Sequence, residues 1–437
     1  MQKMKNGKKV LSVCLSLAMA AGMLSTSAFA SWNVYGGSNN HNAVVTEAPT
    51  RPDKSGLDSY IQLHCTGSGW DGVDNVPVLQ TVNGTTYAYV LYDGYGASGA
   101  LVAKIRCAEN GGSSIVWTTD PYGTEGTSLN AKSGFQLSTP YLDDKGTPDD
   151  ASDDTLYVGT ISQYDDYEGG EWLTGTGSKV MALTGLDQNK PTVTNVLTGI
   201  NGQINTPITT DGTYLYFGTW PGGSNAGTYY QVKLSDYSVK TFTPDSYGFY
   251  WAGAVSDGTN VYFGSDNGLL YWRSIADFDT TGGVLDLTDV ASDAGNVRST
   301  VMLDDGYLYF TTQGGYLWCC SYDDGLTVEW HKKLGATSTS TPTKVGDRIY
   351  VGYYSGFNAG GVQCVSADGS SVKTVVEGDG FPVQSSIVVM GDGTGTDYLY
   401  FNTNAQKGVG YCYSYDGGTT GSKVWGTTGD TYALGGM

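Results

Sequence analysis

Hydrophobic and polar residues alternate in short segments along most of the chain, as expected for β-strands that bury one face. One phrase recurs seven times: an apolar residue, Tyr, an aromatic or aliphatic residue and, in most copies, Gly or Thr. The copies lie at 87–90, 156–159, 215–218, 261–264, 308–311, 349–352 and 399–402. Repeats of this size that contain only strands predict an all-β fold, a β-propeller with one four-stranded blade per repeat.

Each repeat has the same four predicted parts. An inner strand comes first and contains small residues or a Ser/Thr-Pro dipeptide, as at 139–140, 206–207 and 341–342. An Asp-Gly turn, the Tyr-bearing strand, a third strand and an outer strand follow, and the outer strand carries a Trp in three repeats. The repeated Tyr and Trp could form a sugar-stacking surface, but their recurrence in register in every unit favours packing between blades.

The repeats begin near residues 75, 134, 202, 248, 296, 337 and 380, which predicts seven blades. We expect segment 31–74 to help close the ring by sharing the last blade with the C-terminal end. Residues 431–437 resemble the inner strand of a further unit, so eight blades are the alternative. Ring closure of this kind protects the edges of the first and last sheets.

The first 30 residues have the pattern of a secretory signal peptide. Four Lys precede an apolar stretch at 10–24, and Ala28 and Ala30 place the expected cleavage near Ala30. We therefore expect residues 31–437 to form a single propeller domain that is secreted or associated with the cell surface. The remaining chain has no apolar run long enough to span a membrane.

The chain carries a formal net charge of −20, which becomes −24 when the four Lys of the signal are removed. An acidic surface repels nucleic acids, so we expect no nucleic-acid partner. Six Cys remain after export, and three of them, Cys320, Cys364 and Cys412, each precede an Asp-Gly by four residues. We interpret these three as equivalent, buried positions in consecutive blades, too far apart to form disulfides.

The repeats resemble those of the pyrroloquinoline-quinone-like (PQQ-like) β-propeller family, in its exported bacterial form. The resemblance rests on the Ser/Thr-Pro motif, the Asp-Gly turn, the strand at 215–219, the outer Trp330 and the opening segment at 32–42. The family includes quinone-dependent alcohol dehydrogenases as well as scaffolds without catalytic activity. The resemblance implies that an enzyme would need Ca²⁺, an Asp base and flat contacts on both faces of the quinone.

The adjacent pair Cys319–Cys320 is the one feature shared with some of these dehydrogenases, in which a vicinal disulfide stacks on the quinone. Here the pair lies inside a predicted strand, whose alternation points the two side chains to opposite faces. We therefore expect neither a disulfide between them nor a bound PQQ. The three His lack metal-ligand spacing, and the chain has no nucleophile elbow or phosphate loop.

The most acidic segment of the chain is the candidate cation site. It contains Asp143, Asp144, Asp149, Asp150, Asp153 and Asp154. Carboxylates in a loop suit Ca²⁺, but the spacing matches no known Ca²⁺ loop, so a solvated hairpin loop is the alternative. We expect no other cofactor.

A second exposed segment mixes aromatic and acidic residues in a predicted inter-strand loop: Tyr164, Tyr167, Glu168 and Trp172. Loops on a rigid scaffold commonly carry binding sites, so this is the predicted partner site. The favoured hypothesis is a non-catalytic, secreted propeller that binds an extracellular protein or acts as a cell-surface scaffold. A carbohydrate-binding or carbohydrate-active propeller and a quinone-dependent dehydrogenase are the alternatives.

Overall fold

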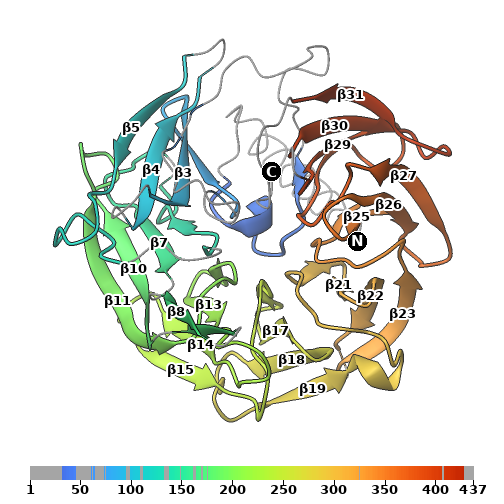
Figure 1. Cartoon of the computed structure of the whole chain (residues 1–437), viewed down its shortest axis with the longest axis horizontal. Coiled ribbons are helices and arrows are strands. Elements are labelled where there is room, and N and C mark those ends of the chain that lie inside the picture. Colours follow the sequence, from blue (N-terminus) through green and yellow to red (C-terminus); the bar gives the residue numbers. More distant parts are fainter. Residues whose placement is uncertain are drawn as a thin grey trace, which may run out of the picture. The chain divides into compact units, whose positions relative to one another are not determined.

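The computed structural model describes residues 32–45, 61, 63, 73, 75–94, 99–108, 112–131, 137–147, 149–160, 164–168, 171–174, 176–323, 325–405 and 408–427. The predicted signal peptide and residues 431–437 lie outside this described part. Seven sheets form a ring around a central channel (Figure 1). Each contains four antiparallel strands that follow one another along the chain, except that one sheet has a separate hairpin inserted between two of its strands. The prediction of a seven-bladed β-propeller is confirmed.

The first four blades follow the chain in order. Blade 1 contains β2 (Val78–Val82), β3 (Thr85–Asp93), β4 (Ala100–Arg106) and β5 (Ser114–Thr118). Blade 2 contains β6 (Tyr141–Asp143), β7 (Thr155–Thr160), β10 (Thr176–Thr184) and β11 (Thr192–Asn201). Blade 3 contains β12 (Thr209–Thr210), β13 (Tyr214–Gly218), β14 (Tyr229–Lys233) and β15 (Val239–Phe242). Blade 4 contains β16 (Val255–Ser256), β17 (Asn260–Ser265), β18 (Leu269–Ser274) and β19 (Gly282–Asp286).

The last three blades complete the ring. Blade 5 contains β20 (Met302–Asp304), β21 (Tyr307–Thr312), β22 (Tyr316–Ser321) and β23 (Thr327–Lys333). Blade 6 contains β24 (Thr343–Val345), β25 (Arg348–Ser355), β26 (Ala359–Ser366) and β27 (Val372–Asp379). Blade 7 contains β28 (Val388–Met390), β29 (Asp397–Asn402), β30 (Gly410–Tyr415) and β31 (Ser422–Gly426), and β1 (Val44–Val45) joins this sheet. A separate hairpin, β8 (Tyr164–Glu168) and β9 (Glu171–Thr174), and the short 3₁₀ turns η1 (Tyr35–Gly37) and η3 (Leu287–Asp289) complete the described elements.

The N-terminal segment 32–45 lies inside the ring, where Figure 1 shows it in blue. Trp32 exchanges backbone hydrogen bonds with Leu79 of blade 1, and the carbonyl of Asn33 accepts from the amide of Leu142 in blade 2. Further along, Asn40 accepts from Leu303 of blade 5, and Ala43 accepts from Val389 of blade 7. We call this segment the channel strap. It connects the first and last blades.

The N-terminal segment joins the sheet of blade 7 on its channel side. Strand β1 of the channel strap pairs in parallel with β28, the innermost strand of blade 7. The C-terminal part of the chain supplies all four of that blade's own strands. Because no outer position is vacant in blade 7, the N-terminal strand is added on the channel side.

Buried side chains fill the spaces between neighbouring blades, from blade 1 through to blade 7. The repeated tyrosines are all buried there: Tyr89, Tyr157, Tyr216, Tyr262, Tyr309, Tyr350 and Tyr400. The outer Trp contacts the repeated Tyr in the three blades that have one, with ring centroids 6.1–6.2 Å apart: Tyr89–Trp117, Tyr309–Trp330 and Tyr400–Trp425. The prediction that these aromatic residues serve packing is confirmed.

Cys319, and not Cys320, is the cysteine equivalent to Cys364 and Cys412. Cys319, Cys364 and Cys412 each pair across the sheet with the repeated Tyr of their own blade. In blade 5 the Asp-Gly lies five residues after the Cys that pairs with Tyr, whereas the spacing is four residues in blades 6 and 7. Counting back four residues from the Asp-Gly therefore identified Cys320 in place of Cys319. Cys319 and Cys320 belong to different blade-to-blade cores and both are free thiols, so the prediction that they face opposite ways is confirmed.

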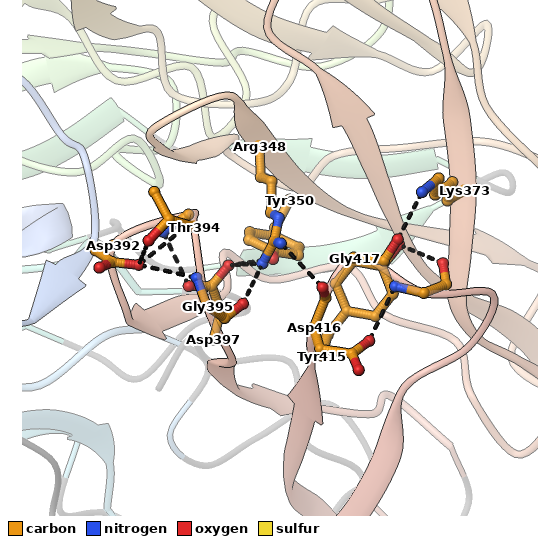
Figure 2. A network of polar contacts seen from close by, with 12 residues as sticks. Arg348, Tyr350, Lys373, Asp392, Thr394, Gly395, Asp397, Tyr415, Asp416 and Gly417 are labelled. Carbon is orange, nitrogen blue, oxygen red and sulfur yellow. Dashed lines mark hydrogen bonds and ion pairs between the residues drawn. The ribbon is translucent and has the colours of Figure 1, made fainter.

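The interface between blades 6 and 7 is held by a buried carboxylate (Figure 2). Asp397 is completely buried, and its Oδ2 accepts hydrogen bonds from Arg348 Nη1 at 2.7 Å and from the Tyr350 hydroxyl at 2.6 Å. Its Oδ1 accepts from the amide of Gly393 at 3.1 Å. Such a carboxylate is stable only while its partners remain, since a buried charge without partners is strongly disfavoured.

Replacing Asp397 by Ala should destabilise the protein. The substitution leaves the Tyr350 hydroxyl without its acceptor and Arg348 without its counter-charge, although Arg348 still donates to the carbonyls of Gly395 and Asp416. We therefore expect the free energy of unfolding to fall by about 3–5 kcal/mol. Chemical denaturation monitored by tryptophan fluorescence would measure this change. The exposed Asp289→Ala is the matched control, and an equal effect of the two substitutions would contradict the role of the carboxylate.

His41 of the channel strap makes stability dependent on pH. It is buried, with Nδ1 2.9 Å from the carbonyl oxygen of Tyr35 and Nε2 2.7 Å from that of Ala254. Burial lowers the pKa of His41 below its usual 6.5, although the two carbonyl oxygens act in the opposite direction. The unfolded chain therefore takes up the proton more readily than the folded chain.

We expect the contribution of His41 to the free energy of unfolding to decrease as the pH falls below 6.5, and a His41→Gln variant to lose this part of the pH dependence, while the raised pKa of Asp154 acts in the opposite direction in both chains. Denaturation curves at pH 7.5 and pH 5.5 would measure it. His331→Gln, at an exposed position of β23, is the control and should keep the dependence. A His41→Gln variant with the pH dependence of the unmodified chain would show that another group is responsible.

Candidate binding site at the mouth of the central channel

A cavity of about 70 Å³ opens at the end of the channel where the innermost strands begin. Every blade contributes a residue that precedes its inner strand: Asn75, Thr139, Asn205, Trp251, Thr300, Thr341 and Ser385. Tyr35 of the channel strap also lines it, and its hydroxyl lies 2.9 Å from the Thr341 hydroxyl. The cavity is large enough for several water molecules or for one end of a small polar ligand.

Several residues that line the cavity carry buried polar atoms that lack partners among the described residues. Asn205 is only 2% exposed, yet neither its amide nitrogen nor its amide oxygen has a hydrogen-bond partner among the described residues. Asn75 donates to the carbonyl of Leu91 at 2.8 Å, but its own amide oxygen and the hydroxyl of Ser385 are also unpaired within the described part. A buried polar group without a hydrogen-bond partner costs about 1–3 kcal/mol, so these atoms favour the binding of a hydrogen-bonding ligand or water.

Arg298, the one ionic side chain among the described lining residues, is neutralised by its neighbour Asp266. Arg298 donates from Nε and Nη2 to the two carboxylate oxygens of Asp266, at 2.7 and 2.6 Å. Burial opposes the charge of Arg298, but the hydrogen bonds and the charge of Asp266 keep its pKa above the usual value. The guanidinium also lies 4.3 Å from the ring centre of Tyr250, which fixes its orientation.

Trp251 enters the lining in a strained backbone conformation. Its φ is 58°, in the left-handed region that side chains other than glycine rarely adopt. Such a conformation costs about 1–3 kcal/mol and persists only where the surroundings enforce it. The amide of Gly253 donates to the carbonyl of Trp251 at 2.9 Å and helps to hold the turn. Strained residues of this kind cluster at functional sites.

These groups are suited to binding and not to acid–base chemistry. The described residues that line the cavity include no carboxylate, imidazole or thiol, and burial raises the pKa of the Tyr35 hydroxyl. The lining consists mainly of amide and hydroxyl groups, which both donate and accept hydrogen bonds. An uncharged ligand rich in hydrogen-bonding groups matches this set.

The acidic segment lies at the opposite end of blade 2, in the connection between β6 and β7. Five of its carboxylates hold local contacts: Asp143 with Lys145, Asp144 with Gly146, Asp149 with Asn83, Asp150 with Ser152 and Asp153 with Thr147. Among the described residues, no group of three or more His, Cys, Asp or Glu side chains is arranged to hold a metal ion. Calcium binding by this segment stays a prediction.

Asp154 differs from the other acidic residues, because it is buried and not part of a solvated loop. It accepts a hydrogen bond from Gln80 of blade 1, and Gln80 in turn accepts from the Tyr89 hydroxyl at 3.0 Å. Burial raises the pKa of Asp154 to about 6, against the opposing hydrogen bond from Gln80. The residue therefore belongs to the interface between blades 1 and 2.

The predicted partner segment forms a hairpin, where the sequence suggested an irregular loop. In the hairpin, Tyr164 pairs with Thr174, Tyr167 with Trp172 and Glu168 with Glu171. It is inserted between the second and third strands of blade 2. Second strands run toward the end of the ring where inner strands begin, so the hairpin rises from the same face as the channel mouth.

Sequence reasoning missed the channel mouth although the signal was present. From the sequence, we assigned the Ser/Thr-Pro dipeptides and their small-residue equivalents to the inner strands. In the structure these residues precede the strands: β6 begins after Pro140 and β24 after Pro342. A motif repeated at the start of every blade converges on the axis, where its polar side chains meet.

Comparisons with known proteins add support for the fold alone. No family model and no curated protein matches the chain. Among solved structures, Sqt1 of Saccharomyces cerevisiae is 12% identical with a TM-score of 0.53, covering 87% of this chain and 91% of that one. BamB of Moraxella catarrhalis is 14% identical with a TM-score of 0.44, covering 76% and 80%. The WD40 β-propeller domain of Doa1 is 12% identical with a TM-score of 0.45, covering 77% and 91%.

Removing the amide of Asn205 should not destabilise the empty protein. Asn205→Ala eliminates two unpaired buried atoms, so we expect the free energy of unfolding to stay unchanged or to rise by about 1 kcal/mol. The matched substitution Asn75→Ala leaves the buried carbonyl of Leu91 without its donor, and should lower the free energy of unfolding by about 1–2 kcal/mol. Chemical denaturation of both variants would distinguish them. A larger loss for Asn205→Ala would show that its amide has a structural role.

Proposed function

We propose that this protein is an exported, non-catalytic β-propeller that binds an extracellular protein partner through the face that carries the channel mouth. The observation that carries the proposal is the hairpin inserted on that face, where two exposed aromatic residues also lie. The cavity lining supports binding without catalysis, as argued from its amide and hydroxyl groups.

Two exposed aromatic side chains lie on connections that reach the mouth face. Tyr122, which is 45% exposed, lies between β5 and β6, and Phe357, which is 43% exposed, lies between β25 and β26. This face carries the connections from one blade to the next, and also the connections between the second and third strands of each blade. Aromatic residues are enriched in protein–protein interfaces because they bury a large area with few rotatable bonds.

The same proposal includes export and membership of the PQQ-like repeat class. Export is supported by the basic and apolar pattern of residues 1–30. The repeat class is supported by the recurrence of the Ser/Thr-Pro motif, the Asp-Gly turn and the Tyr strand in the blades. None of the described helical segments is long and apolar enough to cross a membrane.

A pull-down would test the protein-binding function. Immobilised residues 31–437 would be incubated with cell-envelope and culture-medium extracts of the source organism, and the retained proteins identified by mass spectrometry. We expect a retained protein that is lost with the double variant Tyr122→Ser, Phe357→Ser, because the two changes remove the aromatic contact area.

Tyr307→Ser is the matched control, since Tyr307 is 39% exposed but follows the turn between β20 and β21 on the opposite face. It should retain the partner. Retention by all variants alike, or loss with Tyr307→Ser only, would contradict the assignment of the mouth face.

A further inference from the structure

We propose that the channel mouth is a binding site for a neutral, hydroxyl-rich ligand, namely a single sugar residue at the end of a glycan or free in solution. This site lies at the axis of the ring and does not include Tyr122 or Phe357. It goes beyond the proposed protein-binding function and does not depend on it.

The first argument is the chemistry of the unpaired groups. The amide of Asn205 has a donor nitrogen with two N–H groups beside an acceptor oxygen, and both atoms are buried and without partners in the described part of the chain. A sugar hydroxyl donates one hydrogen bond and accepts others, and neighbouring hydroxyls on a ring can match an amide in both roles. The amide oxygen of Asn75 and the hydroxyl of Ser385 add an acceptor and a second two-way group from other blades.

The second argument is charge. The only ionic side chain among the described lining residues is Arg298, and both carboxylate oxygens of Asp266 are bound to it. An anionic ligand would have to compete with Asp266, whose carboxylate also accepts from the indole N–H of Trp220 at 3.2 Å. A cation would find no free carboxylate in the lining. Neutral ligands are therefore favoured.

The third argument is shape. Trp251 supplies the aromatic surface of the cavity lining, and it is held there in a strained conformation. Sugars have an apolar face made of C–H groups that packs on aromatic rings while the ring hydroxyls reach polar partners at the edge. With a volume of about 70 Å³, the cavity can take one edge of a sugar ring, and the rest of the ligand would extend out through the mouth.

Saturation-transfer NMR on residues 31–437 would test the inference. The probes are the methyl glycosides of glucose, galactose, mannose and N-acetylglucosamine, with glucuronic acid as an anionic probe and N-acetylglycinamide as a peptide-like probe. We expect transfer to at least one neutral glycoside, and binding weaker by about tenfold or more in Asn205→Ala, since the lost amide made hydrogen bonds to the ligand.

Trp251→Ala and Ser385→Ala are second variants at the site, and both should also weaken the binding. Asn195→Ala, on the exposed outer strand β11, is the matched control and should bind as the unmodified chain does.

Binding of the charged or the peptide-like probe alone would overturn the inference. Absence of transfer to any glycoside would also overturn it, and would show that the cavity holds water only. A pull-down that retains no protein, together with glycoside binding by the same chain, would refute the proposed function and leave this site intact.

Discussion

The hydrogen bonds between the channel strap and the inner strands are the interactions on which the ring depends. A propeller gains stability from contacts between adjacent blades, so its weak point is the place where the first blade meets the last. Here residues 32–45 bridge that place from inside: Trp32 is paired with blade 1, and Val44 and Val45 are paired with blade 7. Between these ends, Asn42 forms two hydrogen bonds with the backbone of Lys344 in blade 6. A short segment thus contacts most of the ring and limits how far the blades can separate.

The same constraint shapes the candidate binding site. Because the channel strap occupies the middle of the channel, the space that remains is a shallow cavity at the mouth, with Tyr35 in its lining. The residues that precede the inner strands approach the axis from seven directions, and the polar ones cannot all find partners there. Asn205 shows the consequence, since its amide is buried without a partner among the described residues. A protein tolerates such a cost where binding repays it.

The fold could be predicted from the sequence because the packing signal repeats. The recurring Tyr and Trp mark the same register in each blade, and each copy confirms the others. The errors arose where a count along the chain stood in for the register of the sheet, as with Cys320, or where a segment departs from the repeat, as with the hairpin at 164–174. The candidate site was missed for a different reason. Its residues are far apart in the chain. Although they belong to the segment that recurs at the start of each blade, only closure of the ring brings Asn75, Asn205 and Ser385 to one point. Burial of Asp154 likewise depends on Gln80, a residue of the neighbouring blade.

The measurement that tests this account most directly is the thermal unfolding of a shortened chain, residues 46–437, compared with residues 31–437. Each chain is measured with and without a synthetic peptide of residues 31–45. If the channel strap closes the ring, the shortened chain unfolds at a lower temperature, and added peptide restores the transition in a concentration-dependent way. An unfolding temperature that is the same for both chains and unaffected by the peptide would contradict the account.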